Sequence, residues 1–387
     1  MPPRLLEINV EPAVLKWARE SAGIPATNVA ERLDISPELI NQWESGGKRP
    51  TLRQLEELAN SIYKRPLAAF FLPSPPKEPP LPKDFRTLDS KRAQPLSPKT
   101  LLAIRRARRL QILSTELAKS LNIISKPRFL KLSLNQNPEQ AAAELRKAFK
   151  LKVSSQRLWK NASEALDQWR RVVQSQQIHV FQMSMPLDDS RALSLTHEYF
   201  PAIVLNTKDS INGKIFSLFH EYCHILLNDE GICGEMLSAE AQEIERYCNH
   251  FAGAILAPIE ALLAHPIVAS KGRNIEWSDE ELQRLSLDFK VSQEVLLRRL
   301  LLHQKTTQEF YARKQEEWQE KYRSKTKAIM RQPKPPRKCV RDNGVPFISM
   351  VLEAHRKDKI TYSDVADYLS TKLKYLPKIE EIVNKAV

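Results

Sequence analysis

Residues 215–227 read Ile-Phe-Ser-Leu-Phe-His-Glu-Tyr-Cys-His-Ile-Leu-Leu and place the pattern HExxH inside an apolar stretch. On a helix, residues four apart share a face, so His220 and His224 can hold one metal ion. Glu221 lies beside them on the same helix, where it can reach a water at the ion rather than the ion itself. The segment predicts a buried helix with a zinc centre. The alternative is a helix that carries two ordinary histidines.

A third metal ligand is expected downstream, because a catalytic zinc usually has three protein ligands and a water. A second helix is indicated there, and on it Glu245 and Asn249 are four residues apart and share a face. The gap after His224 allows a loop and an antiparallel return of the chain. The residue types leave Glu243, Glu245 and His250 open as the third ligand.

The first seventy residues indicate four short helices, at 12–22, 26–33, 36–44 and 52–62. Thr51 is a suitable N-cap for the fourth of them. Five apolar residues in this region can close a small core: Ala30, Leu33, Ile35, Ile40 and Trp43.

This region resembles the XRE (Cro/C1-type) helix-turn-helix family. The matching residues are Val-Ala-Glu-Arg-Leu at 29–33, Asp-Ile-Ser at 34–36 and Glu-Ser-Gly-Gly-Lys-Arg-Pro at 44–50, which fits Glu-x-Gly-x-x-x-Pro. The resemblance implies a third helix that enters the major groove of DNA. Family members commonly touch bases from the positions of Pro37 and Glu38, which are poor donors here. The remaining candidates are amides for bases and cations for phosphates: Asn41, Gln42, Lys48, Arg49 and Arg53. A domain kept for protein contact is the alternative.

The zinc motif and the helix after it resemble the ImmA/IrrE family of zinc metallo-endopeptidases. That family pairs HExxH with Glu-x-x-(small)-Asn-x-Phe-Ala. This chain has Glu, Cys, Asn, Phe and Ala at 245, 248, 249, 251 and 252. The resemblance implies Glu245 as the third Zn²⁺ ligand, with Glu243 as the fallback, and Glu221 as the general base. It also implies that Asn249 orients a ligand. A segment at 82–86 is similar to one found in XRE–ImmA/IrrE fusions, so the resemblance covers most of residues 13–310.

The expected fold class is mainly α with a small antiparallel β-sheet (α+β), in which a five-helix-type helix-turn-helix domain precedes a zincin-like metallopeptidase domain. The sheet is indicated by short β-rich stretches at 177–183, 192–199 and 201–207. No internal repeat is apparent. The expected domains are a helix-turn-helix domain at 1–73, a proline-rich linker at 74–96, a metallopeptidase domain at 97–268, a helical extension at 269–330, and a basic linker with a C-terminal helical module at 331–387.

Composition narrows the class of protein. The chain has 387 residues, and 60 Lys and Arg against 46 Asp and Glu give a net charge of +14, which favours a polyanionic partner such as DNA. No apolar run is long enough to span a bilayer, and four cysteines are too few for a disulfide framework, so a cytoplasmic protein without membrane contact is expected. A basic run at 313–338 is either a solvated helix and linker or a nucleic-acid contact.

Together these features predict a cytoplasmic, DNA-binding regulator with zinc-dependent endopeptidase activity. By resemblance, its substrate would be a repressor or other regulatory protein in a stress, phage or mobile-element response. The alternative is a non-proteolytic antitoxin or repressor whose zinc domain is a scaffold for a cognate toxin. An oxyanion donor is left open among Tyr247, His197 and Tyr199, and Cys233 could supply a thiolate to the open zinc position. Whether the chain forms a homodimer is also open.

Overall fold

The computed structural model describes residues 6–81, 96–227, 238–272, 275–324 and 333–385. The chain divides into two compact units. The first unit comprises residues 1–83, 87–106 and 184–189, and the second comprises the remainder. The predicted segment at 82–86 and Cys233 lie outside the described residues.

The first unit holds the helix-turn-helix. Its elements are α1 (Pro12–Ser21), α2 (Ala26–Leu33), α3 (Pro37–Ser45), α4 (Leu52–Glu57), a π-helical segment (Leu58–Ile62) and a 3₁₀ helix (Leu67–Phe71). Thr51 forms a capping box with Gln54 at the start of α4. Val29, Ile40 and Trp43 are among the residues that close the core. The fourth expected helix is therefore two elements, because its last turn widens to π geometry.

The second unit contains one three-stranded sheet with the order β1-β3-β2. Its strands are β1 (His179–Met183), β2 (Ala192–Leu195) and β3 (Ala202–Asn206). The expectation of an antiparallel sheet is wrong for one pair, because β1 pairs with β3 in parallel and only β2 pairs with β3 antiparallel. After the connection at 184–191, β2 forms the edge of the sheet opposite β1, and β3 lies between β1 and β2. β1 and β3 are buried along their whole length, so the hydrophobic pattern could not reveal strand direction.

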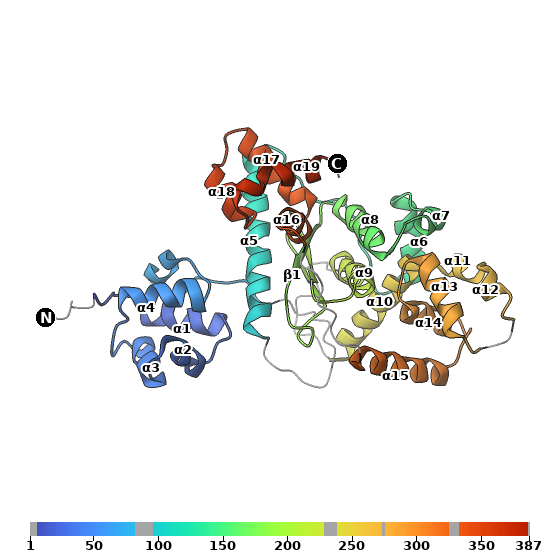
Figure 1. Cartoon of the computed structure of the whole chain (residues 1–387), viewed down its shortest axis with the longest axis horizontal. Helices are drawn as coiled ribbons and strands as arrows, with labels where there is room; N and C mark the ends of the chain where they lie inside the picture. Colours follow the sequence, from blue (N-terminus) through green and yellow to red (C-terminus); the bar gives the residue numbers. More distant parts are fainter. Residues whose placement is uncertain (1–5, 82–95, 228–237, 273–274, 325–332, 386–387) are drawn as a thin grey trace. The chain divides into compact units, whose positions relative to one another are not determined.

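Helices, among which α8, α9 and α16 contact the sheet, make up most of the rest of the second unit (Figure 1). They are α5 (Pro98–Ser120, which begins in the first unit), α6 (Pro138–Ala148), α7 (Val153–Arg157), α8 (Ala162–Gln174), α9 (Ile211–Leu227), α10 (Ser238–Leu256), α11 (Ile259–Leu263), α12 (Pro266–Ala269), α13 (Asp279–Phe289), α14 (Gln293–Leu302), α15 (Gln308–Ser324), α16 (Pro335–Asn343), α17 (Val345–Arg356), α18 (Tyr362–Tyr368) and α19 (Leu376–Asn384). α9 packs against β2, β3, α8 and α10. Trp169 of α8 meets Phe219 of α9 edge-on, with 4.8 Å between ring centroids. None of the described helices is long and apolar enough to cross a bilayer.

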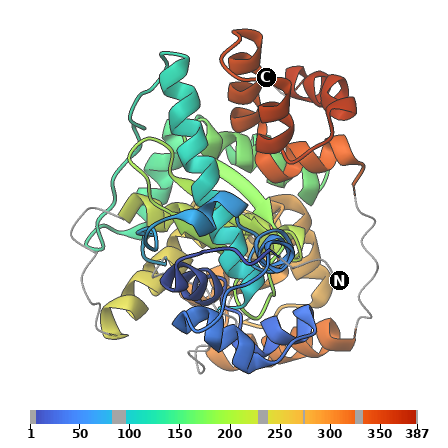
Figure 2. The same ribbon diagram turned by 90° about the vertical axis from the view of Figure 1, so that its left-hand side faces the viewer.

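The C-terminal helices α16–α19 group together beside β1 (Figure 2). Arg170 of α8 donates hydrogen bonds to the carbonyls of Val180 in β1 and Arg341 in α16, at 3.1 and 2.9 Å. The ring of Phe347 in α17 lies 6.1 Å from that of Phe181 in β1. These helices therefore share a unit with the sheet.

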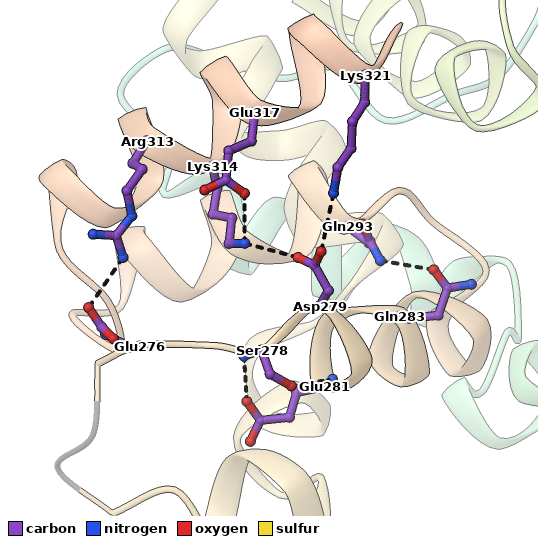
Figure 3. Close-up of polar contacts among 10 residues, drawn as sticks. All are labelled: Glu276, Ser278, Asp279, Glu281, Gln283, Gln293, Arg313, Lys314, Glu317 and Lys321. Atoms are coloured by element: carbon purple, nitrogen blue, oxygen red, sulfur yellow. Dashed lines mark hydrogen bonds and ion pairs between the residues drawn. The ribbon is translucent and has the colours of Figure 1, made fainter. Parts of the chain in front are cut away.

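The described part of the basic run comprises residues 313–324 in α15 and residues 333–338. Ion pairs join α15 to the start of α13 (Figure 3). Lys314 lies 3.0 Å from Asp279, and Lys321 lies 3.3 Å from the same carboxylate. Arg313 pairs with Glu276 at 3.2 Å. These ion pairs join α15 to the start of α13 and to Glu276 before it.

Candidate metal centre

The HExxH residues lie in the middle of α9, where the helix is buried on all sides. His220 and Glu221 have no exposed surface, and His224 is 5% exposed. Apolar residues before and after the motif explain this burial, because they let α9 pack between the sheet and α10. The fold therefore places two imidazoles and one carboxylate in the interior of the second unit.

Glu245 of α10 meets both histidines. Its carboxylate oxygens lie 3.2 Å from His220 Nε2 and 3.3 Å from His224 Nε2, and the two Nε2 atoms are 3.1 Å apart. Donors about 2.0–2.1 Å from a tetrahedral Zn²⁺ would be about 3.4 Å apart. Within the described residues, these three side chains form the one group of histidine, cysteine and acidic residues with metal-ligand spacing. Two imidazoles and one carboxylate in this arrangement fit a zinc ion.

The other third-ligand candidates lie elsewhere. Glu243 is exposed on α10 and is not part of the cluster. His250 is one and a half turns beyond Glu245, and its Nε2 lies 2.6 Å from Glu139 of α6. Of the three alternatives, the structure brings only Glu245 to His220 and His224.

The cluster is strongly coupled electrostatically. Burial alone would raise the pKa of the Glu245 carboxyl, but hydrogen bonds from His220 and His224 hold it well below its ordinary value. For His224 burial acts in the opposite direction and would lower the pKa of the imidazole. Contacts with Cys248 and Glu245 instead raise this pKa well above its ordinary value. The Glu221 carboxylate acts in the same direction. Burial raises the pKa of the Cys248 thiol well above its ordinary value.

Three other predicted residues, Asn249, His197 and Tyr247, have different surroundings. Asn249 makes no hydrogen bond to the three donors within the part of the chain described, and its Oδ1 is buried. His197 Nδ1 accepts hydrogen bonds from the backbone N–H groups of Tyr199 and Phe200, so it organises its own loop. Tyr247 is buried on α10, and burial raises the pKa of its hydroxyl to about 12.

Three buried side chains hold the C-terminal end of α10, and the sequence motifs did not reveal them. Arg146 of α6 donates to Ile255 O at 2.6 Å, and Gln156 of α7 donates to Leu256 O at 2.9 Å. Arg299 of α14 donates to Ala257 O at 3.0 Å. These three consecutive carbonyls have no hydrogen-bond partner within a helix. The positive charges of the two arginines also interact favourably with the negative end of the helix dipole. The helix that carries Glu245 is therefore fixed by three other helices.

Arg299 also forms a bidentate ion pair with Glu139, the residue that contacts His250. The Arg299 side chain lies over Gly253 of α10, where a Cβ atom would be 3.0 Å from Arg299 Cδ. The ion pair joins residues 160 positions apart in the sequence. The one sequence signal for this ion pair is an arginine, Arg299, on an otherwise apolar helix face.

The predicted DNA-contacting residues are all exposed on the first unit. They are Asn41 and Gln42 on α3, Lys48 and Arg49 in the loop after it, and Arg53 on α4. Glu44 of the Glu-x-Gly signature has a different role, because both its oxygens accept hydrogen bonds from Arg19 of α1, at 2.7 and 2.8 Å. Gly46 ends α3 with φ of 81°, a conformation that favours glycine. Glu44 and Gly46 of the signature therefore maintain the fold.

Comparison with known families agrees with this architecture. Residues 15–62 match the family model described as Helix-turn-helix, and residues 173–301 match a peptidase family model described as IrrE N-terminal-like domain. The resemblance to a fusion of an XRE-type helix-turn-helix with an ImmA/IrrE-like domain is confirmed, and so is the mainly helical fold with one small sheet. The second match contains all three donors of the cluster, whereas α6, α7 and α15–α19 lie outside it. No curated protein matches the chain.

Proposed function

We propose that this chain is a DNA-binding regulator that hydrolyses a peptide bond of a partner protein at the His220–His224–Glu245 cluster. The observation that carries the proposal is the donor spacing of 3.1–3.3 Å, which suits one tetrahedral zinc ion. The match to a peptidase family supports the reaction type, and the helix-turn-helix supports DNA binding. The partner would be a repressor or other regulatory protein in a stress, phage or mobile-element response.

Zinc held by these residues would supply Lewis-acid activation of a water and of the scissile carbonyl. Glu221 follows the first ligand on α9 and would take the proton from the water and deliver it to the leaving amine. Its complete burial keeps the carboxylate out of bulk water, where it would otherwise be solvated. Glu245 is 34% exposed, so the cluster reaches the surface through this residue and a peptide would approach from that side.

The decisive variant is Glu221→Gln in the full chain, with Glu243→Gln on the exposed face of α10 as the matched control. Each is incubated with proteins encoded beside this chain, and cleavage is followed by mass spectrometry while bound zinc is measured. The expected result for Glu221→Gln is a 10²–10⁴-fold loss of cleavage with zinc retained, because an amide cannot accept the proton. The control should cleave like the original chain.

The antitoxin alternative gives the opposite result. If the zinc domain is a scaffold for a toxin, Glu221→Gln should keep zinc, DNA binding and the regulatory phenotype unchanged. That outcome would remove Glu221 from catalysis and overturn the peptidase proposal. A loss of zinc from Glu221→Gln would instead show that Glu221 supports the metal, which would overturn the assignment of its role.

A further inference from the structure

The C-terminal helices lie outside both matched families, yet they repeat a pattern of the N-terminal unit. Residues 29–33 read Val-Ala-Glu-Arg-Leu, and residues 365–369 read Val-Ala-Asp-Tyr-Leu. The next buried apolar residues follow at the same spacing, Ile40 and Trp43 in the first case and Leu376 and Ile379 in the second. The two stretches therefore share Val, Ala and Leu and the spacing of the buried residues that follow.

The two segments also share the backbone of the turn. The residue after each Val-Ala-x-x-Leu has a left-handed conformation, with φ of 54° at Asp34 and 48° at Ser370. Two residues later the chain is extended, with ψ of 147° at Ser36 and 139° at Lys372. A second helical segment then begins in both cases. The dihedral angles therefore match at the first and third residues of the two turns.

Backbone hydrogen bonds across the two turns correspond as well. Ile35 N–H donates to Ala30 O at 3.1 Å, and Thr371 N–H donates to Ala366 O at 3.0 Å. In the C-terminal copy the second helical segment opens as a 3₁₀ turn (Leu373–Tyr375) and continues as α19. Pro377 in the first turn of α19 lacks an N–H group, which explains the break.

Packing completes a three-helix arrangement in the C-terminal copy. α17 contacts both α18 and α19, and it supplies the buried residues Val351 and Leu352. Val365 of α18 and Ile379 of α19 are fully buried. Asp367 of α18 pairs with Arg109 of α5 at 2.5 Å, so a carboxylate of the first motif helix is already engaged. The outer face of α19 stays exposed.

The exposed start of the second helix is basic in this copy and acidic in the N-terminal one. Residues 372–378 read Lys-Leu-Lys-Tyr-Leu-Pro-Lys, whereas the equivalent residues 36–42 read Ser-Pro-Glu-Leu-Ile-Asn-Gln. Lys372, Lys374 and Lys378 are all exposed. The ion pair of Lys378 with Glu381 is solvent-exposed and contributes little. In a helix-turn-helix, the N-terminal part of the second helix is the part that meets DNA.

We propose that α17–α19 form a second helix-turn-helix that binds duplex DNA through the phosphate contacts of Lys372, Lys374 and Lys378. The chain then has one DNA-binding element in each unit. The C-terminal element supplies cations at positions where the N-terminal element has Ser36, Glu38 and Gln42. It contributes affinity and salt dependence more than base selection, because lysines on phosphates carry no sequence information.

The test compares two triple variants of the full chain in binding to a duplex of about 30 base pairs, by fluorescence anisotropy from 50 to 200 mM salt. The first variant is Lys372→Gln, Lys374→Gln and Lys378→Gln. The second makes the same charge change at exposed lysines of α6–α8 and their connections, namely Lys147→Gln, Lys152→Gln and Lys160→Gln. Loss of three phosphate contacts should make the slope of log K against log[salt] less negative by about 2–3 in the first variant only.

A second readout tests contact directly. A photo-crosslinking residue at position 374 should attach to the duplex, and the same residue at position 147 should not. Equal slopes for the first variant and the original chain, or no crosslink from position 374, would overturn the proposal and leave this surface as a protein contact. Circular dichroism of each variant checks that these exposed substitutions keep the fold.

Discussion

Replacing Glu139 by Gln should destabilise the second unit. Glu139 lies in the first turn of α6 and accepts hydrogen bonds from both arms of the Arg299 guanidinium, whose side chain is 1% exposed. It also contacts His250 at 2.6 Å. An amide cannot neutralise Arg299, so the variant leaves a buried charge without a counter-charge.

The magnitude follows from the pKa of Glu139. Burial alone would raise this pKa, but hydrogen bonds from His250 and Arg299 lower it to about 2, against an ordinary value of 4.5. This difference corresponds to about 3 kcal/mol of stability at neutral pH, and breaking a buried ion pair typically costs about 3–5 kcal/mol. Because the folded-state pKa is depressed, the contribution is present above the ordinary pKa and is lost as pH falls toward 2. At pH 3.5 it should be smaller by about 1 kcal/mol.

Native-state hydrogen exchange of the α6 and α10 amides measures the opening free energy of this unit alone. Glu144→Gln, on the exposed side of the same helix, is the matched control and should change it by less than about 0.5 kcal/mol. Arg299→Met in the Glu139→Gln background should recover part of the loss, since it removes the unpaired charge. Additive effects of the two substitutions, or an effect of Glu139→Gln that does not shrink at pH 3.5, would refute the ion-pair reasoning.

Three further predictions concern the metal, DNA and the core. The purified chain should carry about one zinc, and mass spectrometry should show weakened binding in Glu245→Ala and normal binding in Glu243→Ala, because only Glu245 meets both histidines. Lys48→Ala should weaken binding to all DNA sequences in gel retardation, whereas Asn41→Ala should change the preference among them; equal effects on every sequence would contradict the assignment. Trp169→Ala should lower the free energy of unfolding by about 3–5 kcal/mol in urea titrations, since this ring is fully buried against α9.

The sequence was sufficient for features that depend on residues close together in the chain. The spacing of His220 and His224 places both on one face of a helix, and Thr51 marks a helix start. The choice of Glu245 over Glu243 needed the family resemblance, because both residues lie on the same predicted helix. The structure brings Glu245 to the histidines.

Features that depend on distant residues were not readable in the same way. The parallel pairing of β1 with β3 depends on where β2 is inserted, and fully buried strands carry no alternation that would reveal it. The C-terminal repeat was missed because its second helix replaces Trp43 by Ile379 and lacks the glycine after Glu44. Its turn is recognisable only from the left-handed conformation of Ser370.

The metal centre depends on both kinds of information. HExxH fixes the distance between two imidazoles through the pitch of α9, but the distance to Glu245 depends on the position of α10. That position is set by Arg146, Gln156 and Arg299, which bind three consecutive carbonyls at the end of α10. Two of these side chains come from α6 and α7, outside the stretch matched to the peptidase family. The motif therefore identifies the donors, whereas helices without a motif determine whether the three donors meet at the spacing that one zinc ion needs.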